Sequence, residues 1–80
     1  MSRKIPPMSS RRFRRLLERG GARFVRQRGT SHAIYERLVG NRRFTAPVIS
    51  GAKELSPGYM KMVFRQLGFT DEEIEVLLKD

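Results

Sequence analysis

Three short runs in the middle of the chain are strand candidates separated by turn residues, and apolar and polar residues alternate most clearly in the second. The runs "ARFVRQR", "HAIYERL" and "RRFTAPV" occupy residues 22–28, 32–38 and 42–48. Alternation with a period of two is typical of half-buried strands, so the pattern predicts three of them. The segments between the runs, "GTS" and "VGN", supply glycine for tight turns. The simplest sheet that such short connections allow is an antiparallel three-stranded meander.

Three further segments, residues 9–21, 55–69 and 70–80, carry the signals of amphipathic helices. In each segment, a hydroxyl residue at the first or second position can cap a helix. In the first two segments, a glycine near the end marks where the helix stops. In the third, Thr70 and Glu73 have the spacing of a capping box. The order of helix, three strands, helix and short C-terminal helix predicts an α+β domain with its helices on one face of the sheet. This topology is similar to that of double-stranded-RNA-binding domains.

The domain organisation follows from length and from the position of prolines. Residues 1–7 are expected to form a flexible basic arm, because Pro6 and Pro7 remove backbone donors and disfavour a helix. Residues 8–80 are expected to form a single domain. A domain of this size has little room for a deep cavity, so any functional site should be shallow.

The net charge of the chain indicates which class of molecule it binds. The chain has 17 Lys and Arg against 8 Asp and Glu, a formal net charge of +9. The charge is concentrated in residues 1–45, which hold 13 basic and 2 acidic side chains. Such asymmetry indicates a half that faces RNA or a membrane surface, and nucleic acid is the leading class of partner for so basic a chain. The remainder of the chain is mildly acidic and suits a protein partner.

Other functions are disfavoured by what the chain lacks. It has no cysteine, so there is no disulfide framework, thiolate nucleophile or Cys-ligated metal site, and no cofactor is expected. No apolar run approaches the roughly 18 residues of a membrane span, and the first residues lack the apolar centre of a signal peptide. We therefore expect a cytoplasmic protein that needs neither a metal nor a membrane.

The stretch "RGTSHAIYER" contains His32, the single histidine of the chain. Imidazole can take up and return a proton near neutral pH without special tuning. RNA is a matching substrate, because its 2′-hydroxyl attacks the adjacent phosphate once a base removes the proton and an acid protonates the leaving 5′-oxygen. This reaction needs no metal. A solvated histidine in a turn, without a catalytic role, is the alternative interpretation of His32.

Cations and donors beside the histidine would bind the phosphate. Arginine is suited to this by its fork of donors. Gly29 would allow a sharp turn and a close approach to phosphate, with hydroxyl and amide donors from Thr30 and Ser31. The arginines expected near His32, in sequence or across the meander, are Arg26, Arg28, Arg42 and Arg43.

Two motifs together resemble those of the HicA family of bacterial toxins. They are "RFVRQRGTSHAIYER", with its Gly-x-Ser-His turn, and "KELSPGYMKMVFRQLGF", in which Lys-Glu-Leu leads into a helix that ends in Arg-Gln-x-Gly. The resemblance extends over roughly residues 9–78. It implies an mRNA interferase with a fold like the double-stranded-RNA-binding domain, which cleaves messenger RNA without a metal and is neutralised by a HicB-type antitoxin.

The resemblance also assigns individual residues. The family's catalytic histidine matches His32, and its glycine and serine match Gly29 and Ser31. Basic positions that could contact RNA or the antitoxin match Lys53, Lys61 and Arg65. Many family members have a second histidine, either directly after the first or in the loop after the third strand, where this chain has Ala33 and "PVISGAK". His32 would then move the proton in both directions, or Tyr35, Lys53 or water would serve as the second group. A non-catalytic RNA-binding module is the alternative function.

Overall fold

The structure, a computed structural model, describes residues 5–79. Within them no helix has the length and apolar character that crossing a lipid bilayer requires. The α+β fold class is confirmed, and each element agrees with its predicted position to within a few residues. The elements are α1 (Ser10–Arg19), β1 (Ala22–Arg28), β2 (His32–Val39), β3 (Arg42–Ile49), α2 (Pro57–Gln66) and α3 (Asp71–Lys79).

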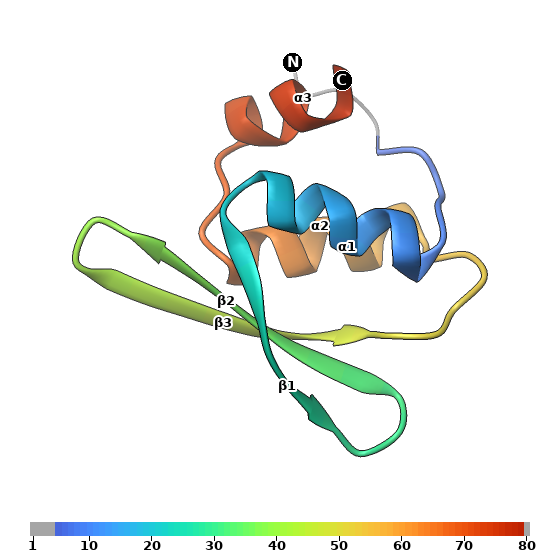
Figure 1. Cartoon of the computed structure of the whole chain (residues 1–80). Helices are drawn as coiled ribbons and strands as arrows, with labels where there is room; N and C mark the ends of the chain where they lie inside the picture. The colour runs from blue at the N-terminus through green and yellow to red at the C-terminus, as the bar shows by residue number, and fades with distance from the viewer. Residues whose placement is uncertain (1–4, 80) are drawn as a thin grey trace.

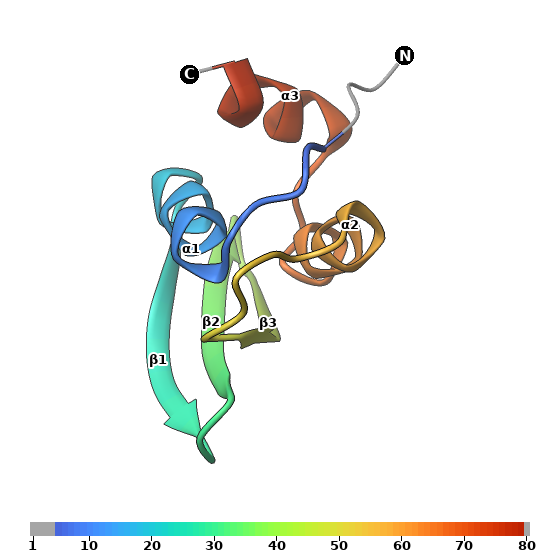
Figure 2. The same cartoon turned by 90° about the vertical axis from the view of Figure 1, so that its right-hand side faces the viewer.

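The six elements form layers. The three strands pair antiparallel in the order β1-β2-β3, as the short connections predict. Figure 1 shows α1 and α2 over one face of the sheet and α3 beyond them. The view turned by 90° shows the same layers, and in it the β1–β2 hairpin extends past the end of β3, away from the helices (Figure 2). The other face of the sheet is left uncovered by helices.

The helices begin where the capping signals predict. Ser9 and Ser56 are the N-caps of α1 and α2, and each hydroxyl accepts a hydrogen bond from a backbone N–H three residues later. The capping box of α3 is present in both directions: Glu73 Oε1 accepts from the N–H of Thr70 at 2.8 Å, and Thr70 Oγ1 accepts from the N–H of Glu73 at 3.1 Å. These caps satisfy backbone donors that the helices leave without partners.

The chain joins the core earlier than the predicted arm allows. Residues 1–4 lie outside the described part, but Ile5 is buried in the core at 7% exposure. Met8 then pairs with Leu55, whose N–H donates to the Met8 carbonyl at 2.7 Å. The prediction of a flexible arm over residues 1–7 is therefore wrong for Ile5. An isoleucine that can reach an apolar surface gains free energy by packing against it.

Aromatic rings fill the space between the sheet and the helices. Phe64 contacts Phe13 edge to face at 5.2 Å between centroids and contacts Phe69 in the same way at 5.1 Å. Phe13, Phe64 and the central-strand residue Tyr35 are fully buried. Each such pair contributes about 0.5–1.5 kcal/mol of stability beyond the contribution from burying its apolar area. They hold α1, α2 and the segment leading into α3 together.

Arg37 is the buried polar residue that ties the three helices to the central strand. It is only 7% exposed, and its guanidinium lies 3.8 Å from the centroid of the Phe69 ring. Its Nε donates to the carbonyl of Gly20 at 3.0 Å, and Nη1 donates to the carbonyl of Leu67 at 3.2 Å. Nη2 donates to Glu73 Oε2 at 2.7 Å. One side chain thus satisfies the ends of α1 and α2 and pairs with the start of α3.

Glu73 makes the free energy of unfolding depend on pH in the acid range. Its pKa is held below its ordinary value mainly by the hydrogen bond from the Thr70 N–H, with a further contribution from Arg37. A lowered pKa means that its stabilisation is present above the ordinary pKa and disappears as the pH falls through the folded-state pKa. Glu73→Gln should therefore lower stability at pH 7 and leave it unchanged in strong acid. The side chain is 44% exposed, so we expect a loss below about 1 kcal/mol.

The measurement is the free energy of unfolding by urea across the acid range. Glu72→Gln is the matched control, because that neighbouring carboxylate is exposed and has no hydrogen-bond or ion-pair partner within residues 5–79. Equal pH dependence in both variants would contradict the role assigned to Glu73.

Candidate RNA-cleavage site

The candidate site is built around the turn that joins β1 to β2. Gly29 has φ +64°, a left-handed backbone conformation that residues with a Cβ rarely adopt. The backbone of the turn therefore requires a glycine at this position. The N–H of Ser50, just after β3, donates to the carbonyl of Ser31 at 2.9 Å. His32 follows as the first residue of β2 and is half-buried. Its Nδ1 lies 3.2 Å from the Ser31 hydroxyl oxygen.

His32 shares the uncovered face of the sheet with two arginines of the neighbouring strand. Successive side chains of β2 alternate, and the fully buried Ala33 and Tyr35 occupy the helix-covered face. Across the sheet, Arg28 pairs with His32 and Arg26 pairs with Ile34. Directly paired residues point to the same side, so both arginines flank the imidazole on its own face.

This placement depends on an irregularity in β1. The pairing with β2 shifts between Phe24 and Arg26, which leaves Val25 as an extra residue. A β-bulge of this kind reverses the alternation of the residues that follow it. Without the bulge, Arg26 and Arg28 would turn toward the helices. With it, Gln27 is the residue that pairs with Ala33 of the helix-covered face, and its exposed amide donates to Ser50 Oγ at 3.3 Å.

Two other arginines of the uncovered face are already paired. Arg23 and Arg43 each lie 3.3 Å from a carboxylate oxygen of Glu36, whose side chain is only 7% exposed. Neither Arg26 nor Arg28 has a hydrogen-bond or ion-pair partner within residues 5–79. The positive charge that remains available on this face is therefore concentrated next to His32.

The remaining predicted residues are placed as follows. Thr30 is exposed in the turn. Arg42 does not approach His32: it pairs with Val39 at the other end of β2 and lies over the Phe44 ring at 5.3 Å. The expectation that the meander gathers Arg42 and Arg43 beside His32 is wrong, because an antiparallel pair brings the start of one strand to the end of the next. Two lysines lie on other elements, Lys53 exposed in the β3–α2 loop and Lys61 half-buried on α2.

Tyr35 is removed from the candidates for a second acid or base. Its ring is fully buried on the face opposite His32. The hydroxyl accepts a hydrogen bond from Arg14 Nε at 2.8 Å and donates to Glu18 Oε2 at 3.2 Å. Burial is the main cause of a pKa raised above the ordinary value for tyrosine. A phenol so placed orients Arg14 and does not exchange protons with His32, which leaves Lys53 or water.

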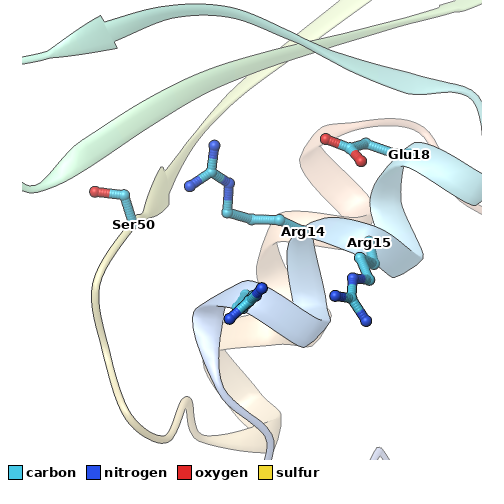
Figure 3. A pocket seen from close by; sticks show the side chains of 5 residues that line it. Arg14, Arg15, Glu18 and Ser50 are labelled. Carbon is cyan, nitrogen blue, oxygen red and sulfur yellow. The ribbon is translucent and has the colours of Figure 1, made fainter.

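A second basic site lies on the helix-covered side, and the sequence pattern did not single it out. A shallow cleft of about 350 Å³ opens between α1 and the start of the β3–α2 loop. Figure 3 shows Arg14 reaching from α1 toward Ser50, with Glu18 on the same helix. The one signal in the sequence is the spacing of the arginines, which puts residues i, i+3 and i+4 on one side of a helix. The lining residues are Arg11, Arg14, Arg15, Glu18 and Ser50.

Comparison with known proteins identifies the family. The model of the HicA toxin of bacterial toxin–antitoxin systems matches residues 10–69, which run from the start of α1 to the segment before α3. The chain belongs to the HicA toxin family. No curated protein and no solved structure matches it. The matched HicA region includes the turn, His32, both arginines of its face and the arginine cleft, whereas α3 lies outside it.

Membership gives the HicA chain a biological setting. A toxin of a toxin–antitoxin system acts against the cell unless a cognate antitoxin holds it in check. Within residues 5–79, no three side chains of His, Asp or Glu cluster in a way that could hold a metal ion. The side chains at the turn between β1 and β2 instead supply an imidazole, hydroxyls and guanidinium groups.

Proposed function

We propose that this chain is a metal-independent endoribonuclease that cleaves messenger RNA, and that a HicB-type antitoxin neutralises it. The observation that carries the proposal is the pairing of His32 with Arg28 on the uncovered face, beside a glycine turn that leaves room for a phosphate. A proton-transfer group and a phosphate-binding cation then lie on adjacent strands, at the roughly 5 Å spacing of paired residues.

The reaction follows from the groups present. His32 removes the proton of a ribose 2′-hydroxyl, and the oxygen attacks the neighbouring phosphorus. The bond to the 5′-oxygen breaks, and that oxygen takes up a proton from the imidazolium or from a second donor such as Lys53 or water. Charge that grows on the phosphate oxygens is stabilised by Arg28, Arg26 and the donors of the turn. The products are a 2′,3′-cyclic phosphate and a 5′-hydroxyl.

The nucleophile belongs to the substrate, and this is why RNA is favoured over DNA. DNA has no 2′-hydroxyl, so the same site would bind it without cutting. We expect the antitoxin to bind the face of the sheet opposite the helices, since occlusion of His32 would stop cleavage. A protein with acidic groups facing Arg26 and Arg28 would suit that surface. The same chemistry and the family membership support a cytoplasmic site of action, where messenger RNA is translated.

The test is incubation of the purified protein with a defined RNA in the presence of EDTA. We expect new fragments that carry 5′-hydroxyl and 2′,3′-cyclic phosphate ends, and no cleavage of the DNA of the same sequence. An RNA that is bound but remains intact would contradict the proposal and favour the non-catalytic RNA-binding module. Fragments with 5′-phosphate ends would contradict the 2′-hydroxyl mechanism.

A further inference from the structure

The arginine cleft on the helix-covered side holds more positive charge than its own contacts neutralise. It is lined by three arginines and one carboxylate, that of Glu18. Glu18 Oε2 already accepts a hydrogen bond from the Tyr35 hydroxyl. Arg11 and Arg15 are exposed and have no hydrogen-bond or ion-pair partner within residues 5–79. The residues that line the cleft therefore leave it with a net positive charge.

Arg14 is held in place with part of its donor fork unused. Its Nε donates to the hydroxyl of the fully buried Tyr35 at 2.8 Å. The guanidinium also lies 5.6 Å from the centroid of the Tyr35 ring and 5.8 Å from that of Phe24. Its terminal nitrogens have no hydrogen-bond partner within residues 5–79. A guanidinium fixed on one edge, with its other donors available, is preorganised for an oxyanion.

The cleft is also fixed relative to the turn that carries His32. At the start of α1, the N–H of Ser10 donates to the Ala52 carbonyl at 3.0 Å, and Ser10 Oγ accepts from the Ala52 N–H at 2.9 Å. These two bonds hold the arginine-bearing helix against the β3–α2 loop. That loop begins at Ser50, which lines the cleft and donates its N–H to the Ser31 carbonyl. A single residue, Ser50, thus borders both the cleft and the His32 turn.

We infer that the arginine cleft binds a backbone phosphate of the RNA, on the strand whose scissile phosphate lies at His32. The inference rests on the proposed function and extends it to residues that take no part in the chemistry. A nucleic acid strand presents a phosphate at every nucleotide, so a strand that passes over the edge of the sheet at Ser50 can occupy both sites. The cleft contributes affinity, and the uncovered face performs the reaction.

The test uses the double variant Arg11→Gln/Arg15→Gln and leaves Arg14, which supports the core, unchanged. The matched control is Arg12→Gln/Lys79→Gln, which changes the net charge equally at exposed residues that do not line the cleft. The probe is a fluorescein-labelled single-stranded RNA with 2′-O-methyl groups throughout, which cannot be cleaved by 2′-hydroxyl attack. Its binding is measured by anisotropy over a range of salt concentrations.

We expect the cleft variant to bind about tenfold more weakly at low salt, as the loss of charge-assisted hydrogen bonds implies. The slope of log K against log salt should decrease by about 0.7, the value for one phosphate of a single strand. With cleavable RNA, KM should rise about tenfold while kcat stays within about twofold. The control should change affinity by less than about twofold.

The two proposals fail in different ways. Equal binding and equal salt slopes for the cleft variant and the control would overturn the phosphate site, even if both cleave RNA. Loss of binding in the cleft variant alone would support the site, even if no variant cleaves RNA. A fall in kcat with KM unchanged would also overturn the inference, because it would place the cleft in the chemical step.

Discussion

His32→Ala should lower the rate of RNA cleavage by roughly 10²- to 10⁴-fold, the usual contribution of a positioned acid or base. The variant loses the one side chain of the chain that can exchange a proton readily near neutral pH. RNA affinity should change little, because Arg26, Arg28 and the turn remain. Cleavage is measured on a defined RNA under single-turnover conditions, and toxicity is measured as growth arrest on expression.

The fold should tolerate this substitution. The ring of His32 makes one hydrogen bond within residues 5–79, to the Ser31 hydroxyl, and the side chain is only half-buried. We expect the melting temperature of His32→Ala to stay within a few degrees of the parent. Ser31→Ala is the matched control: it keeps the imidazole but removes the partner of Nδ1, so its cleavage rate should fall much less. Equal cleavage by the parent and a folded His32→Ala would rule out His32 as the acid–base group.

Local signals were sufficient to predict the elements of the fold. The hydroxyl caps, the glycines after helices and in turns, and the alternation of β2 each act within a few residues, so they can be read from the chain directly. The turn around His32 is local in the same way, since Gly29, Ser31 and His32 are consecutive or nearly so. For this reason the part of the candidate site that lies in the turn was predictable.

Features that depend on the tertiary structure were not predictable. The bulge at Val25 has no glycine to mark it, yet it decides that Arg26 and Arg28 face the same side as His32. The arginine cleft exists because Ser10 and Ala52 fasten α1 to a loop about 40 residues away. Ile5 was placed in an arm because prolines follow it, whereas its burial is decided by the distant core.

The net charge also needed the structure for its interpretation. Counting residues treats every arginine of the first half as available to RNA. In the structure, Arg37 is buried, and Arg23 and Arg43 are paired with Glu36. Of the arginines in this half that have no hydrogen-bond or ion-pair partner within residues 5–79, Arg26 and Arg28 flank His32, and Arg11 and Arg15 line the arginine cleft. These two groups of arginines are more informative about the path of RNA than the total charge of +9.

Arg37→Ala should be the most destabilising single substitution among the arginines of the sheet. It leaves the buried carbonyl of Leu67 and the partly buried carbonyl of Gly20 without their donor and removes the cation over the Phe69 ring. Each unsatisfied buried group costs about 1–3 kcal/mol, and we expect a total loss of about 3 kcal/mol. Glu73 adds little to this cost, because its exposed carboxylate can return to water. For a domain of this size the melting temperature should fall by roughly 12–24 °C.

Arg23→Ala is the control that separates burial from charge. Arg23 also belongs to the sheet and also pairs with a glutamate, but its side chain is 75% exposed, so its loss should cost less than about 1 kcal/mol. Arg37→Lys should fall between the two, since an ammonium keeps the charge but cannot reach three acceptors with a planar fork. Thermal and urea unfolding of the three variants give the comparison. Similar losses for Arg37→Ala and Arg23→Ala would mean that the helix ends do not depend on the buried guanidinium, and that apolar packing, which includes the buried Ile74 and Leu77, holds α3 in place.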